Sequence, residues 1–177
     1  MAHGSEGIVN SEWHVEDDGL LFDSDDYGFK VRLEDIVLLG ELATPDGPAV
    51  DDYFLVLFTR DGARHHASFY ADGREAALAA LSNYWRTPIT LRLSASDALA
   101  SNILWPASHA GQALFEFRRQ AAASFMGRVR ERMGFVAIEQ ELSPAAQECL
   151  TQSTTLRTSS SSMPDLTAAL RNAHDGS

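Results

Sequence analysis

Acidic side chains at short, regular spacing are the first candidates for chemistry in this chain. The segment Asp23–Glu34, DSDDYGFKVRLE, has aspartate at positions 1 and 3, glycine at 6 and glutamate at 12, the spacing of a calcium-binding EF-hand loop. Position 5, however, is Tyr27 instead of a carboxylate or amide, and the flanking sequence predicts strands rather than helices. An acidic β-turn explains the same residues, so we expect no calcium site.

The histidines are the next candidates, as metal ligands or as proton carriers. His65 and His66 are adjacent on a predicted strand, so their side chains face opposite ways. His14 and Glu16 share a face, but a zinc site needs three or four converging ligands. We therefore predict no metal and no cofactor. A small enzyme that uses His14, His65, His66 and the acidic turns remains an alternative, and it requires at least two of these side chains in one pocket.

Other catalytic motifs are absent from the sequence. No GxSxG, GxGxxG or GxxxxGK[ST] pattern occurs, and Lys30 is the only lysine, so a serine nucleophile, a phosphate cradle and a Schiff base lack support. Cys149 is the only cysteine, which excludes an internal disulfide and is typical of a reducing cytoplasm. No secretion signal or membrane-spanning run is apparent, and we expect a cytoplasmic protein.

The negative charge is concentrated in the first third of the chain. Residues 1–60 have 14 acidic side chains and three basic ones, Lys30, Arg32 and Arg60, a balance of −11. This equals the net charge of the whole chain, so the remaining residues are neutral on balance. This distribution argues against nucleic acid or an anionic membrane as a partner. It favours either a solubilising surface or a face for a basic protein partner. The candidate acidic residues for such a face are Asp17, Asp18, Asp23, Asp25 and Asp26.

Arginines form the main basic feature of the second half. Apolar residues at three- and four-residue steps predict a helix from about Ser108 or Glu116 to Met133, although Ala113–Phe117 also reads as a short strand. On that helix Arg118, Arg119, Arg130 and Arg132 would line the polar flank. They would form a solvated face, contact the acidic third, or bind an acidic partner.

The elements up to Trp85 are predicted from strong local signals. Period-two alternation and acidic turns predict a meander of three strands within residues 13–33, and the apolar runs Ile36–Leu39 and Tyr53–Phe58 predict interior strands. Asp61-Gly62 predicts a hairpin turn. Asp72, as N-cap with Glu75 three residues later, predicts the start of an amphipathic helix that ends before Pro88.

The second half is predicted from weaker signals. Alternation predicts a strand over Ile89–Ser94, and Ser96 is expected to begin a short helix through Ser101. Phe135–Leu142 fits either a strand or a helix. Ser143, followed by proline, predicts a capped helix to about Thr151. Residues 152–177 are expected to form a flexible Ser/Thr-rich tail, with a possible short helix at 164–173.

Together these elements predict one α+β domain at residues 8–151 with a mainly antiparallel sheet packed by amphipathic helices. The order up to Trp85 resembles the strand-rich, helix-capped layout of bacterial pleckstrin-homology-like modules, which implies a partial barrel. We expect a non-enzymatic module that docks or neutralises a basic protein partner. Besides the enzyme, the remaining alternative is a self-assembling structural protein, which would form homo-oligomers.

Overall fold

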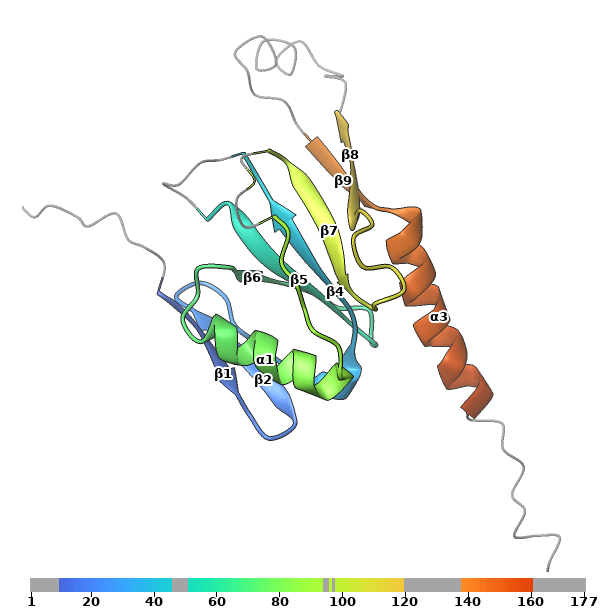
Figure 1. Ribbon diagram of the computed structural model, residues 1–177, viewed down its shortest axis with the longest axis horizontal. Helices are drawn as coiled ribbons and strands as arrows, with labels where there is room; N and C mark the ends of the chain where they lie inside the picture. The colour runs from blue at the N-terminus through green and yellow to red at the C-terminus, as the bar shows by residue number, and fades with distance from the viewer. Residues whose placement is uncertain (1–9, 46–50, 94–95, 97, 120–137, 161–177) are drawn as a thin grey trace, which may run out of the picture.

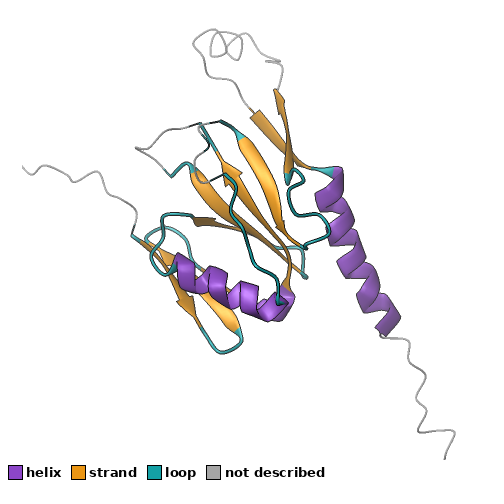
Figure 2. Ribbon diagram, in the orientation of Figure 1, coloured by secondary structure: helices purple, strands orange, loops and turns teal. Residues whose placement is uncertain are grey.

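The computed structural model describes residues 10–45, 51–93, 96, 98–119 and 138–160. Over these residues the chain is an α+β protein with antiparallel sheets and two α-helices (Figures 1 and 2). The strands are β1 (Ser11–Val15), β2 (Gly19–Ser24), β3 (Phe29–Arg32), β4 (Ile36–Ala43), β5 (Tyr53–Thr59), β6 (Arg64–Ser68), β7 (Ala100–Trp105), β8 (Phe115–Arg119) and β9 (Ile138–Leu142). The two α-helices are α1 (Arg74–Trp85) and α3 (Pro144–Ser160). A short 3-10 helix, η1 (Leu33–Asp35), joins β3 to β4.

The first three strands form an antiparallel sheet in the order β1-β2-β3, which confirms the predicted meander. Alternate residues turn toward the interior: Trp13 pairs with Phe22 across β1 and β2, and Leu20 pairs with Val31 across β2 and β3. All four of these side chains are buried. The period-two pattern therefore produces a sheet with one buried face, as expected for an antiparallel sheet with a wet side.

The second sheet has four strands in the order β6-β5-β4-β7, all antiparallel. Every residue of β4 is buried, which confirms that this apolar run is an interior strand covered on both faces. Two hydrophobic cores cover the two faces of this sheet. The first core packs one face against the β1–β3 sheet and helix α1, and it includes Leu39, Leu55, Leu57, Ala77 and Leu81. Trp85 of α1 stacks on Trp105 of β7, with ring centroids 4.3 Å apart.

The second core covers the opposite face of the four-stranded sheet. Leu38, Val56 and Ile103 from the sheet pack there against Phe115 of β8 and Ala146 of α3. Figure 1 shows α3 along this side, with the β8–β9 ribbon extending beyond the sheet. Neither helix is long and apolar enough to span a membrane, within the part of the chain that the structure describes.

The strand predicted at Ile89–Ser94 is wrong over the described residues 89–93, which are irregular. The amides of Arg92 and Leu93 donate to the carboxylate of Glu41 on β4, at 3.1 and 3.4 Å, instead of pairing with another strand. The short helix expected from Ser96 to Ser101 is also wrong, because β7 already begins at Ala100 and pairs with β4.

The helix expected from Ser108 or Glu116 to Met133 is wrong where it can be compared. Residues 108–112 form turns, and residues 115–119 form β8, in register with β9. The structure contains the alternative strand in a shifted position, as β8 at Phe115–Arg119, and the strand option for Phe135–Leu142 is confirmed over its described residues, 138–142. Arg118 and Arg119 consequently lie on a strand, and residues 120–137, including Arg130 and Arg132, lie outside the described residues.

The two predicted helix caps have different outcomes. Ser143 is confirmed as the cap of α3, because its Oγ accepts a hydrogen bond from the amide of Ala146 at 3.1 Å. Asp72 is not the cap of α1: that position is held by Gly73, and no side chain caps the helix. Helix α3 continues to Ser160, beyond the end expected near Thr151, and the possible helix at 164–173 lies outside the described residues.

Candidate functional site

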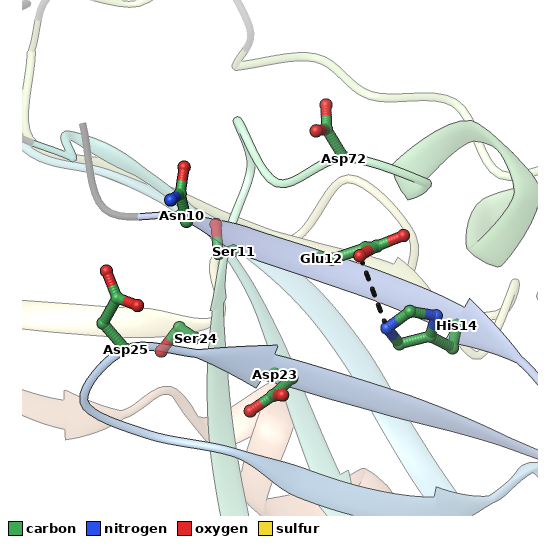
Figure 3. Close-up of a pocket in the computed structure, with 8 residues that line it drawn as sticks. All are labelled: Asn10, Ser11, Glu12, His14, Asp23, Ser24, Asp25 and Asp72. Atoms are coloured by element: carbon green, nitrogen blue, oxygen red, sulfur yellow. Dashed lines mark ion pairs between the residues drawn. The ribbon is translucent and has the colours of Figure 1, made fainter.

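An acidic hollow of about 360 Å³ lies around strand β1 (Figure 3). Its lining combines residues from β1, from the end of β2 and from the segment before α1. The lining residues are Asn10, Ser11, Glu12, His14, Asp23, Ser24, Asp25 and Asp72. Four of these eight side chains are carboxylates, and none is lysine or arginine.

The position of Asp72 in this hollow depends on the edge of β1. The amide of Trp13 donates to the carbonyl of Asp72 at 2.8 Å, and the amide of Asp72 donates to the carbonyl of Ser11 at 2.9 Å. These bonds make a parallel bridge between Glu12 and Asp72. Gly73 follows with a φ of 74°, and a Cβ at this residue would collide with the carbonyl oxygen of Trp13. Glycine therefore permits the close approach of the two backbone segments that carry Glu12 and Asp72.

The charges in the acidic hollow are largely unneutralised. Within the described chain, Asp23, Asp25 and Asp72 form no ion pair, and the only pair among the lining residues joins Glu12 to His14 at 3.6 Å. By contrast, Glu16, in the turn between β1 and β2, forms an ion pair with Lys30 of β3 at 2.6 Å. The hollow is thus a local concentration of exposed negative charge.

The carboxylates surround β1 without converging on one point. Figure 3 shows Asp72 on one side of the strand and Asp23 and Asp25 on the other. Among the residues that the structure describes, no group of three potential ligands is close enough to hold a metal ion. This arrangement suits attraction of an extended cationic segment rather than chelation of a small ion.

The structure divides the five predicted acidic residues between two places. Asp23 and Asp25 line the hollow, and Asp26 follows them in the turn before β3. Asp17 and Asp18 lie in the β1–β2 turn, at the other end of a six-residue strand that spans roughly 17 Å. Asp18 also pairs there with Arg32 at 3.2 Å.

Two acids of the hollow were missed from the sequence, Glu12 and Asp72. The sequence pattern predicts Asp72 as a helix N-cap, and a side chain in that role would bond to the helix and would not face a partner. No short-range signal indicates that the segment before α1 bonds to β1, 59 positions earlier at Trp13. Glu12 is exposed and precedes the buried Trp13 on β1, so alternation predicts its outward direction but not its proximity to Asp72.

The arginine candidates do not form a free basic face where they are described. Arg118 pairs with Glu141 of β9 at 3.3 Å and with Glu116 of β8 at 3.8 Å. Its partners are therefore neighbours on the same ribbon and not the acidic N-terminal third. Arg119 ends β8 opposite Ile138.

The three histidines named in the enzyme alternative, of which at least two must converge, line three different hollows. His14 lines the acidic hollow, His65 lines a second hollow with Lys30 and Arg60, and His66 lines a third with Phe22 and Phe54. His65 is held by the Tyr27 hydroxyl, 3.0 Å from its Nδ1, and by stacking on Phe29 at 4.4 Å. In these three hollows of the described chain, each histidine lies without either of the other two.

Comparison with known proteins adds no relative to this picture. No family model, no curated protein and no solved structure matches the chain. The geometry of the acidic hollow is consequently the basis on which a function is argued.

Proposed function

We propose that this protein is a non-enzymatic binding module and that its acidic hollow receives a basic segment of a protein partner. The observation that carries the proposal is the lining of the hollow: Glu12, Asp23, Asp25 and Asp72 surround β1 with no lysine or arginine among them. Complementary charge of this kind accelerates encounter and selects the partner's sign of charge more than it adds affinity.

The surroundings of the hollow support a protein segment as the occupant. Exposed carboxylates repel nucleic acid and anionic lipid, both of which require basic patches. The carboxylates are contributed by three segments and spread along β1, so one small cation cannot contact them all. A chain with several lysines or arginines can contact each carboxylate with a separate side chain.

Fluorescence anisotropy with a labelled decapeptide of alternating arginine and glycine tests the proposal. We expect saturable binding to the full chain at low salt that weakens as salt rises from 50 to 500 mM, because screening shortens the reach of exposed charges. The triple variant D23N/D25N/D72N should weaken binding roughly tenfold, since each exposed pair contributes at most about 1 kcal/mol.

A matched control changes the net charge by the same amount elsewhere. Glu116, Glu139 and Glu148 lie on β8, β9 and α3, outside the acidic hollow. The variant E116Q/E139Q/E148Q should bind the peptide within about twofold of the wild type. Equal losses in the two triple variants would show that total charge, and not the hollow, attracts the peptide, and the proposal would be wrong.

We propose in addition that the part up to Trp85 is related to pleckstrin-homology-like modules and that the protein acts in the cytoplasm. The packing of a three-stranded sheet against a four-stranded sheet on one core supports the first proposal. Helix α1, which precedes β7, β8 and β9 instead of ending the chain, departs from that layout. The single cysteine, Cys149, which is buried and unpaired, supports the second.

A further inference from the structure

A separate hollow of about 240 Å³ has aromatic rings in its walls and a single charged group. It is lined by Ser11, Phe22, Ser24, Tyr27, Asp51, Phe54, His66 and Ser68. None of these eight residues is lysine or arginine, and none of the carboxylates of the acidic hollow is among them. This aromatic hollow is therefore a feature of the molecule distinct from the acidic hollow.

The rings of the aromatic hollow are tilted against one another. The centroids of Phe22 and Tyr27 lie 6.5 Å apart at an interplanar angle of 50°. Those of Phe54 and His66 lie 6.4 Å apart at 62°. Phe22 is 2 % exposed and Tyr27 is 43 % exposed, so Phe22 contributes to the base of the hollow and Tyr27 to its rim. Rings set at such angles present surfaces in several directions, as the walls of a cage around a compact group do.

The electrostatics of the aromatic hollow favour a cation. Asp51 supplies the one charge of the lining and forms no ion pair with any residue that the structure describes. Burial, with smaller contributions from the charges of Arg64 and His65, lowers the pKa of His66 to about 4, so its ring is neutral at neutral pH. Arg64 itself lies over the ring of Phe115, 5.7 Å from its centroid. The faces of aromatic rings are negative and attract a cation within about 6 Å of the centroid.

The polar side chains of the aromatic hollow are already engaged. Ser24 Oγ donates to the carbonyl of Tyr27 at 2.7 Å and accepts from its amide at 3.2 Å. Ser68 Oγ accepts from the amide of Tyr70 at 3.1 Å. The Tyr27 hydroxyl lies 3.0 Å from His65 Nδ1. A lysine ammonium or an arginine guanidinium has several N–H groups that need acceptors, whereas a quaternary ammonium has none and is held by contact and charge.

We propose that the aromatic hollow binds a quaternary ammonium group, of the trimethylammonium type present in choline and in trimethylated lysine. The rings of Phe22, Tyr27 and Phe54 provide the aromatic surfaces, and Asp51 provides the opposite charge. The hollow is smaller than the roughly 300–1,000 Å³ of pockets for drug-sized ligands, which suits a compact head group. This inference goes beyond the proposed function, because it concerns a different hollow and a different ligand.

Choline and its neutral isostere neohexyl alcohol, in which carbon replaces the ammonium nitrogen, test the inference on the unaltered protein. Heteronuclear NMR of the full chain follows the amide signals of Tyr27, Phe54 and His66, with ionic strength held constant by sodium chloride. We expect choline to bind with a Kd of about 1 to 10 mM and the alcohol at least about fivefold more weakly. Equal affinities would mean that the hollow takes any compact apolar group, and the inference would be wrong. The absence of shifts at about 100 mM choline would contradict it as well.

Variants of the protein link the effect to the rings. Y27L removes the ring at the rim and should weaken choline binding about fivefold, whereas Y27F keeps the ring and should bind within about twofold of the wild type. Y84A removes an exposed aromatic side chain of α1 outside the hollow, 49 % accessible, and should change nothing. The NMR spectra of the three variants check that the fold is retained. If Y27L does not fold, the comparison of choline with its isostere on the wild type remains decisive.

The variant D23N/D25N/D72N separates this site from the acidic hollow. It should leave the affinity for choline within about twofold of the wild type, while it weakens the arginine peptide of the proposed function roughly tenfold. If it weakens choline binding as much as Y27L does, general negative charge attracts the ammonium. The inference then fails and the proposed function stands.

A trimethylated peptide identifies the source of the ammonium group. The peptide is Gly-Gly-Lys-Gly-Gly with a trimethylated lysine, and the same peptide without methyl groups is its control. Binding tighter than that of choline, with the control at least about fivefold weaker, assigns the hollow to a methylated protein. Tighter binding of choline assigns it to a free small molecule. Equal binding of the two peptides would contradict a site for quaternary ammonium groups.

Discussion

The hydroxyl of Tyr53 donates a 2.5 Å hydrogen bond to the carboxylate of Glu41 in the interior of the protein. Glu41 is 0 % exposed, and it forms no ion pair with any residue that the structure describes. Its oxygens also accept from Asn102 at 2.8 Å and from the amides of Arg92 and Leu93. Burial, together with this hydrogen bond to Glu41, raises the pKa of the Tyr53 phenol. One carboxylate on β4 thus connects two strands and the irregular segment after α1.

We expect E41Q to lower the free energy of unfolding by about 2 to 3 kcal/mol, because a glutamine amide presents donors to groups that are themselves donors. Y53F removes one donor and leaves the carboxylate three others, so its cost should be about 1 kcal/mol. Urea unfolding followed by tryptophan fluorescence measures both. If E41Q were no less stable than Y53F, the carboxylate would not be the organising group of this network.

Glu41 also explains why one part of the fold was predicted and another was not. The strands up to Ser68 pair with neighbours along the chain, so alternation and turn residues were sufficient. Residues 89–93 show the same alternation, but the amide of Arg92 bonds to a side chain 51 residues earlier. Pattern alone does not identify such a partner.

The ribbon β8–β9 and the acidic hollow were difficult for related reasons. Leu114, Phe115 and Phe117 fit both a helical and a strand period, and only the pairing of Phe115 with Leu142 settles the type. In the hollow, Asp23 and Asp25 were predicted from local charge, whereas Asp72 required knowledge that its segment bonds to β1. Long-range pairing is the physical information that a single sequence lacks.

Ser143 should be more important for stability than Asp72, although both resemble helix caps in the sequence. Ser143 Oγ accepts from the amide of Ala146 and donates to the carbonyl of Ala113 at 2.5 Å, so it joins α3 to the segment before β8. We expect S143A to cost about 1 to 2 kcal/mol of unfolding free energy.

The comparison variant is D72A, which removes a side chain that makes no cap bond to α1. Its effect on stability should stay within about 0.5 kcal/mol, as for other exposed substitutions. Chemical denaturation of the two variants under identical conditions gives the difference. A D72A cost equal to that of S143A would show that Asp72 is a cap and contradict the assignment of Gly73.

Gly40 is required on β4 by the packing of Leu114. A Cβ at residue 40 would lie 2.5 Å from Leu114 Cδ2 and 2.9 Å from the carbonyl oxygen of Asn102 on β7. Leu114 is fully buried in the second core, so it cannot move aside without cost. We expect G40A to lower the free energy of unfolding by about 1 to 3 kcal/mol.

A double-mutant cycle isolates the contact between these two residues. L114A alone should cost about 2 to 5 kcal/mol through the cavity that it leaves. In G40A/L114A the added methyl group meets less obstruction, so the combined loss should be smaller than the sum of the single losses by at least about 0.5 kcal/mol. Strict additivity would mean that the Asn102 carbonyl, and not Leu114, limits residue 40.

His66 should make the protein less stable as the pH falls through the weakly acidic range. Burial, with smaller contributions from the charges of Arg64 and His65, lowers the pKa of His66 to about 4 from an ordinary value of 6.5. Below pH 6.5 the unfolded chain therefore takes up a proton at this residue that the folded chain does not, and the free energy of unfolding decreases. Between pH 6.5 and 5 the loss should be roughly 1 kcal/mol, reduced from the full linkage value because the side chain is only partly buried.

Unfolding free energies of the wild type and of H66F at pH 7.5, 6.5, 5.5 and 5.0 measure this contribution. Both proteins contain the other histidines, including His65, so the difference between their slopes isolates His66. This window lies above the ordinary pKa values of carboxylates, which keeps their titration out of the comparison. An NMR titration of the His66 ring with a midpoint near 6.5, or an H66F slope equal to that of the wild type, would show that the imidazole is not desolvated. A midpoint near 4 would confirm that burial keeps this ring neutral in the folded protein through the weakly acidic range.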